Sequence, residues 1–101
     1  MAKSRQLALM KAGTPGPLGT FKEVRDALAR FNTAPDGSKA SMGLHRLHAP
    51  GFVVEIPTAV EEIQQAMVTM NEEEIAWPVL QRICRELKWK MVDLESGRSF
   101  G

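Results

Sequence analysis

The 101-residue sequence lacks several features by which functional classes are recognised. It has one cysteine and no tyrosine, and a lone cysteine excludes a disulfide framework within one chain. No apolar run approaches the ~20 residues that a membrane-spanning helix needs. The apolar stretch Leu7–Met10 is too short for the core of a secretory signal. We therefore expect a small cytoplasmic protein with no membrane association.

The sequence also has no strong catalytic or metal-binding pattern. His45 and His48 are the only two histidines. In a strand, positions three apart point to opposite faces, so these imidazoles would not converge on a metal ion. Cys84 lies beside the apolar stripe of a predicted helix and is interpreted as a buried thiol. We expect no metal and no cofactor, and an enzymatic function is the less favoured interpretation.

Charge is nearly balanced in total but unevenly distributed along the chain. The formal net charge is +1, which excludes a strongly basic nucleic-acid binder. Residues 1–30 contain six Lys and Arg side chains against two acidic ones, whereas residues 52–74 contain six glutamates and no Lys or Arg. These segments either attract each other, within one chain or between chains, or form two separate solvated faces.

Glycine and proline divide the chain into a tail and a domain. The stretch Gly13–Gly19 holds three glycines and two prolines, which disfavours regular structure. We predict a flexible basic tail and linker over residues 1–19 and a single domain over residues 20–101. Nucleic-acid binding is not expected, except weakly through this basic tail.

The first predicted helix begins after Thr20. Thr20 and Glu23 have the spacing of a capping box. Phe21, Val24 and Leu28 then begin an apolar stripe with helical spacing, and the helix should end near Asn32. A turn over residues 33–37 follows.

A β-hairpin is predicted around Ala49-Pro50-Gly51. Its strands are residues 44–48 and 52–56, and Pro-Gly suits the centre of a type II turn. Pairing Ala49 with Phe52 sets Leu47 opposite Val54 and His45 opposite Ile56. Arg46 then faces Glu55 on the outer side of the sheet.

The second half of the chain predicts a strand, a helix and a strand. Residues 58–70 are ambiguous: we favour a strand over about 63–70, and a short helix near 59–66 is the alternative. Asn71 is the expected N-cap of the second helix, in which Pro78 predicts a kink or a later start. Trp89 and Met91 share one face of a final strand, with Ser99-Phe100 pairing back. The fold class is α+β, with a three- to four-stranded, mainly antiparallel sheet and two helices on one face.

Two functional hypotheses follow. The first is a non-enzymatic interaction or regulatory module that forms a homodimer or larger homo-oligomer, or binds another protein. It rests on an exposed sheet edge, on the segregated charge and on apolar residues off the presumed core face (Val53, Val68 and Val92). Trp77 is a further candidate interface residue, because tryptophan is enriched at interface hot spots. The second is a small-ligand or catalytic protein that uses a polar cluster of Arg46, His48, Glu55 and Arg98. Trp77 has the alternative role of closing the edge of a small core.

Overall fold

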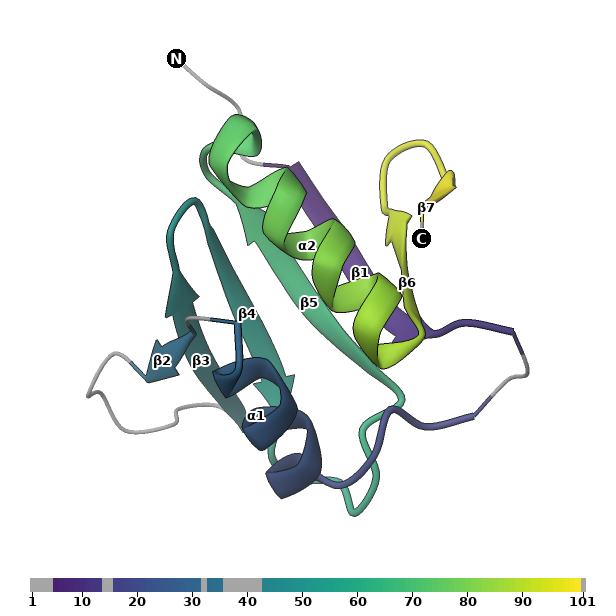
Figure 1. Cartoon of the computed structure of the whole chain (residues 1–101). Coiled ribbons are helices and arrows are strands. Elements are labelled where there is room, and N and C mark those ends of the chain that lie inside the picture. Colours follow the sequence, from purple (N-terminus) through teal and green to yellow (C-terminus); the bar gives the residue numbers. More distant parts are fainter. Residues whose placement is uncertain (1–4, 14–15, 32, 36–42, 101) are drawn as a thin grey trace.

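One antiparallel sheet with two helices on the same face makes up the described part of the chain in the computed structural model (Figure 1). The structure describes residues 5–13, 16–31, 33–35 and 43–100. The seven strands have the order β2-β3-β4-β5-β1-β6-β7, and every neighbouring pair is antiparallel. The elements are β1 (Arg5–Lys11), α1 (Phe21–Ala29), β2 (Ala34–Pro35), β3 (Leu44–Ala49), β4 (Phe52–Pro57), β5 (Gln65–Met70), α2 (Glu73–Leu87), β6 (Trp89–Asp93) and β7 (Ser99–Phe100).

The α+β class is confirmed, but the sheet has more strands than the three or four expected. Strands β2 and β7 contain two residues each, too short to carry an alternating pattern in the sequence. The pairing of Ser99-Phe100 with β6 is as expected, since Phe100 lies opposite Met91 and Ser99 opposite Val92. The larger difference is β1.

Strand β1 corrects the prediction of a tail over residues 1–19. Arg5–Lys11 pairs with β5 on one side and with β6 on the other, so it lies inside the sheet. Leu7 and Leu9 are fully buried against the helices, and Ala8 is buried on the opposite face. A strand between two others, whose neighbours bury most of its side chains, is expected to have a nearly continuous apolar sequence. That run is Leu7–Met10, followed by the linker.

Helix α1 begins at the predicted capping box. The Glu23 backbone N–H donates to Thr20 Oγ1 at 3.2 Å, and the Thr20 backbone N–H donates to Glu23 Oε1 at 2.9 Å. Val24 and Leu28 are buried on its inner stripe. The helix ends at Ala29, whereas the predicted end at Asn32 lies outside the described residues.

The predicted β3–β4 hairpin is confirmed in register and in turn. Ala49 lies opposite Phe52, Leu47 opposite Val54 and His45 opposite Ile56. Gly51 has φ of +86°, which the third position of a type II turn requires. The favoured strand in the ambiguous segment is also confirmed, as β5 over Gln65–Met70.

The start of α2 differs from the prediction. The N-cap is Glu72, which makes no side-chain capping hydrogen bond, rather than Asn71. The backbone N–H groups of Asn71 and Glu72 both donate to the Gly51 carbonyl, at 2.8 and 3.1 Å. The β3–β4 turn therefore lies against this end of α2 and holds the approach to the helix. The helix continues through Pro78 to Leu87.

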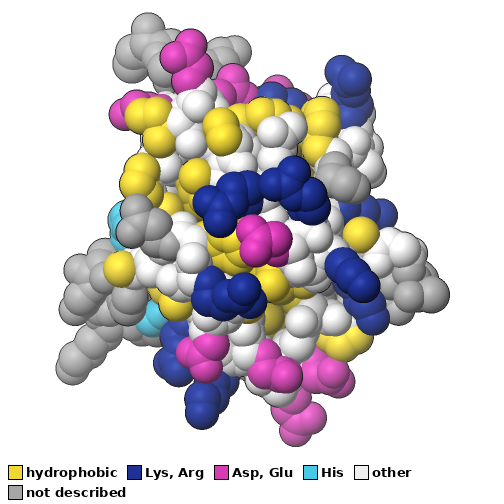
Figure 2. Space-filling view, in the orientation of Figure 1, with side chains coloured by type: hydrophobic (Ala, Val, Ile, Leu, Met, Phe, Trp, Pro, Cys, Tyr) yellow, Lys and Arg dark blue, Asp and Glu magenta, His cyan; other side chains and the backbone are white. Residues whose placement is uncertain are grey.

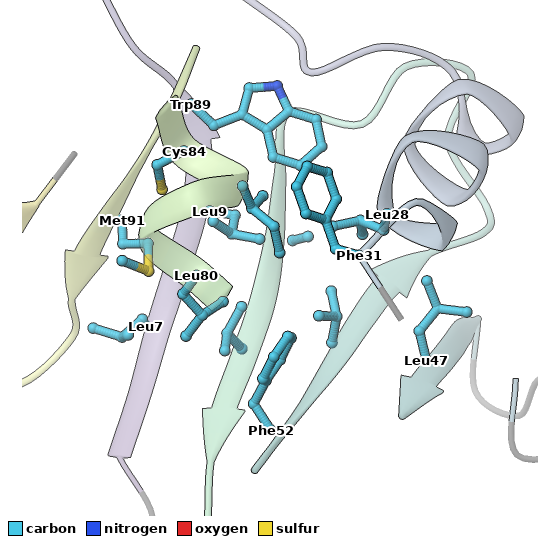
Figure 3. Close-up of a cluster of buried hydrophobic side chains, with 14 of the residues drawn as sticks. Leu7, Leu9, Leu28, Phe31, Leu47, Phe52, Leu80, Cys84, Trp89 and Met91 are labelled. Carbon is cyan, nitrogen blue, oxygen red and sulfur yellow. The ribbon is translucent and has the colours of Figure 1, made fainter. Parts of the chain in front are cut away.

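The hydrophobic core lies between the two helices and one face of the sheet. Leu7, Leu9 and Met91 of the sheet meet Leu80 and Cys84 of α2 (Figure 3). Strands β5 and β6 are parallel to each other with β1 between them, so β5, α2 and β6 form a split β–α–β unit. Val68 belongs to this core and is fully buried, which corrects its predicted place on the outer face.

Candidate functional site

The outer face of the sheet, opposite the helices, is the candidate site. Alternation along the strands sends every second side chain to this face. It presents Val53 and Glu55 of β4, Met67 and Thr69 of β5, Ala8 and Met10 of β1, and Lys90 and Val92 of β6. Both helices of the described residues lie on the other side (Figure 1).

An apolar band crosses the middle of the outer face. Ala8 lies directly opposite Met67 of β5 on one side and Val92 of β6 on the other. Ala8 is only 1% exposed, although the face carries no helix in the described chain. Met67, Val92, Met10 and Val53 are each half-buried. We define the outer band as Val53, Met67, Ala8, Met10 and Val92.

Polar groups flank the outer band on both sides. On the β3 side, Arg46 Nε donates to Glu55 Oε2 at 3.1 Å, as the hairpin register predicts. His48 is exposed on the next row, opposite Val53. On the β6 side, Lys90 lies opposite Met10. An apolar centre with a charged margin is the anatomy of a protein-protein interface.

The predicted polar cluster is brought together only in part. Arg46, His48 and Glu55 occupy neighbouring positions on β3 and β4. Arg98 precedes β7 at the opposite end of the sheet, and its guanidinium carbon lies 5.8 Å from the centroid of the Phe100 ring. The small-ligand hypothesis therefore loses Arg98 as a member of the cluster and stays a prediction for the other three residues.

The other histidine turns toward α1. The rings of His45 and Phe21 pack edge to face, with centroids 5.2 Å apart. His45 Nε2 is buried and has no hydrogen-bond partner in the described part of the chain. His45 and His48 thus point to different sides of the sheet, as the strand geometry predicts. Within residues 5–13, 16–31, 33–35 and 43–100, no group of three or more metal-ligating side chains is placed to hold an ion.

The predicted interface residues fall in two places. Val53 and Val92 belong to the outer band, on β4 and β6. Trp77 lies on α2, where its ring packs edge to face on Phe100 with centroids 5.1 Å apart and Arg5 lies over it at 5.8 Å. Trp77 thus contributes to an intramolecular cluster. The sequence reasoning missed Met67, Ala8 and Met10, whose alternation becomes visible once β1 is recognised as a strand.

Arg5 joins the two oppositely charged segments within one chain. Its Nη1 donates to Glu73 Oε1 at 2.8 Å, and its Nε donates to Asp93 Oδ2 at 2.8 Å. Backbone N–H donation from Glu95, together with Arg5, lowers the pKa of Asp93.

Burial raises the pKa of the Cys84 thiol to about 11, so at neutral pH this thiol is not the nucleophilic thiolate.

Comparison with protein-family models, curated proteins and solved structures gave no significant match. Neither helix of the described residues has the length and apolar character that crossing a bilayer requires.

Proposed function

We propose that the protein is a non-enzymatic interaction module that self-associates through the outer face of its sheet. The observation that carries this proposal is the outer band, in which Met67, Ala8 and Val92 form an apolar row across β5, β1 and β6, with Val53 and Met10 in the adjacent rows, on a face that no described helix covers. Apolar surface of this kind is stabilised when it is removed from water. The cytoplasmic location expected from the single cysteine stays a prediction.

The charge pattern around the outer band fits a second copy of the same chain. A homodimer interface with two-fold symmetry must be self-complementary. An axis running along the sheet between β5 and β1 would set β4 of one copy over β6 of the other. Because Glu55 and Val92 share one row of the sheet, Glu55 of one copy would then lie over Val92 of the other, with Lys90 one row away. Aligned packing of two sheets is a common arrangement in proteins.

The helix-bearing face is the poorer candidate for an apolar interface. Figure 2 shows that Lys and Arg side chains gather across the middle of this face around one acidic side chain, with further acidic side chains toward its upper and lower margins. Desolvating that many charges would be unfavourable unless each found a partner. The outer band itself contains no charged side chain, so burying its centre carries no desolvation penalty of this kind.

Light scattering coupled to gel filtration tests the proposal. The wild-type protein is expected to elute as a dimer, and Met67→Lys as a monomer with an unchanged far-UV circular dichroism spectrum. Val60→Lys is the matched control, because Val60 lies outside the strands and is already 49% exposed. The control should remain dimeric. A wild-type protein that is monomeric up to ~1 mM, the range of very weak association, would overturn the proposal.

A further inference from the structure

A cavity of about 650 Å³ opens beside the C-terminal half of α2, away from the outer band. Among its lining residues, we call the buried or half-buried Cys84, Trp89 and Phe100 the floor, and the exposed Gln81, Arg85 and Lys88 the rim. Phe100 reaches the cavity because β7 pairs with β6, where Phe100 lies opposite Met91. Its volume is within the range of small-molecule sites.

The floor of the cavity is apolar and closely packed. Trp89 is 6% exposed and Cys84 is 2% exposed, so each presents only a small part of its surface to the cavity. The raised pKa of Cys84 keeps its thiol neutral. The floor thus offers aromatic and thiol surface without charge, which suits a planar ring. It provides no nucleophile, so the cavity is suited to binding rather than to covalent chemistry.

The rim carries two cations and no carboxylate. Gln81 and Arg85 lie four residues apart on one stripe of α2, and Lys88 is the residue that follows the end of the helix. Arg82, on a different stripe of the same helix, is paired with Glu86 at 3.5 Å. Neither Arg85 nor Lys88 forms an ion pair within the described part of the chain. An anion at the rim would therefore meet two cations that no described carboxylate neutralises.

Lys88 also has an unusual backbone. Its φ is +59°, and it is the one non-glycine residue with positive φ among those described. The left-handed position after a helix is most often glycine, because a Cβ is disfavoured there. A lysine at this position places its side chain on the cavity rim at the expense of local backbone energy. Strained positions of this kind concentrate at functional sites.

We propose that this cavity binds a small aromatic carboxylate, with the ring against Trp89 and Phe100 and the carboxylate between Arg85 and Lys88. Guanidinium and ammonium groups bind carboxylates through charge-assisted hydrogen bonds. This binding does not depend on self-association, because none of the cavity residues belongs to the outer band.

Titration with naphthalene-2-carboxylate, followed by nitrogen-proton NMR correlation spectra, tests the proposal. Saturable shifts are expected for the indole N–H of Trp89 and for the backbone amides of Arg85 and Lys88. The double variant Arg85→Gln/Lys88→Gln should bind at least about tenfold more weakly. Arg82→Gln, which removes the same charge from another stripe of α2, should bind as the wild type does. Absence of saturable shifts in the wild-type protein, or equal weakening by Arg82→Gln, would overturn the proposal.

Two further binding experiments separate the contribution of the aromatic ring from that of the carboxylate charge. The neutral analogue 2-naphthalenemethanol should bind more weakly than the carboxylate, and equal binding would refute the role of the cations. Ala12→Phe fills the cavity from the β1 side while keeping both cations. It should abolish the shifts, whereas unchanged binding would show that the ring does not enter the cavity. Dispersed spectra of each free variant confirm that it is folded.

Discussion

Arg5 and Asp93 form a two-contact ion pair that joins the first long strand to the last. Nε of Arg5 donates to Oδ2 of Asp93 at 2.8 Å, and Nη2 lies 2.6 Å from the same oxygen. Asp93 is 5% exposed, and its carboxylate also accepts hydrogen bonds from the backbone N–H groups of Glu95 and Ser96. This carboxylate therefore connects β1, β6 and the turn that leads to β7.

The pair makes stability depend on pH in a definite direction. The pKa of Asp93 is lowered, first by the Glu95 backbone N–H and then by Arg5. The stabilisation is thus complete above the unfolded-state pKa of roughly 3.9 and is lost as pH falls through the lower folded-state pKa. Thermal melts of wild type and Asp93→Asn should differ most at neutral pH and converge in acid. A difference in melting temperature that stays constant from neutral pH into acid would contradict this account.

Gly51 is predicted to be intolerant of any side chain. A Cβ there would lie 2.9 Å from the Glu72 carbonyl oxygen and 3.0 Å from the Ala76 nitrogen, at a φ of +86°. Gly51→Ala should lower the free energy of unfolding by about 3 kcal/mol or more, measured by urea denaturation, because strain and backbone overlap add. Gly97 is the matched control, since it has φ of +75° but open space around it.

Gly97→Ala should lower the free energy of unfolding by only about 1–2 kcal/mol, the cost of a left-handed alanine. Equal losses for the two variants would show that the contact between the β3–β4 turn and α2 does not constrain Gly51. In that case the turn geometry alone would explain both glycines.

The interior position of β1 predicts a large loss of stability on truncating one of its leucines. Leu9 is fully buried, and Leu9→Ala should lower the free energy of unfolding by about 2–5 kcal/mol in urea denaturation. Leu94→Ala makes the same chemical change at a side chain that is 49% exposed, and it should change stability by less than about 0.5 kcal/mol. Leu9→Ala with wild-type stability would restore the view of residues 1–19 as a tail.

Local signals predicted much of this fold. The capping box at Thr20 and Glu23 and the hairpin around Gly51 are both confirmed, because each is decided by residues close in sequence. Strand β1 was missed because its partners, β5 and β6, lie more than fifty residues away along the chain. A four-residue apolar run before a Pro/Gly linker has no local feature that distinguishes a central strand from a tail.

The two candidate sites could not be predicted from the sequence for the same reason, because each is formed by residues far apart along the chain. The outer band needs Ala8 beside both Met67 and Val92, a juxtaposition that only the strand order β5-β1-β6 creates. The cavity beside α2 needs Phe100 placed by β7 near Trp89. In contrast, the pairing of Arg46 with Glu55 was predictable, because a short turn fixes the register of the hairpin.

Lys88→Gly is predicted to separate stability from binding. Glycine adopts the left-handed region freely. The free energy gained by relieving the backbone strain at a φ of +59° should therefore exceed the extra entropic cost of ordering a glycine on folding. We expect the free energy of unfolding to rise by about 0.5–1 kcal/mol in urea denaturation. The same variant removes one rim cation and should bind naphthalene-2-carboxylate more weakly. A stabilised variant with undiminished binding would show that Lys88 serves only to end the helix.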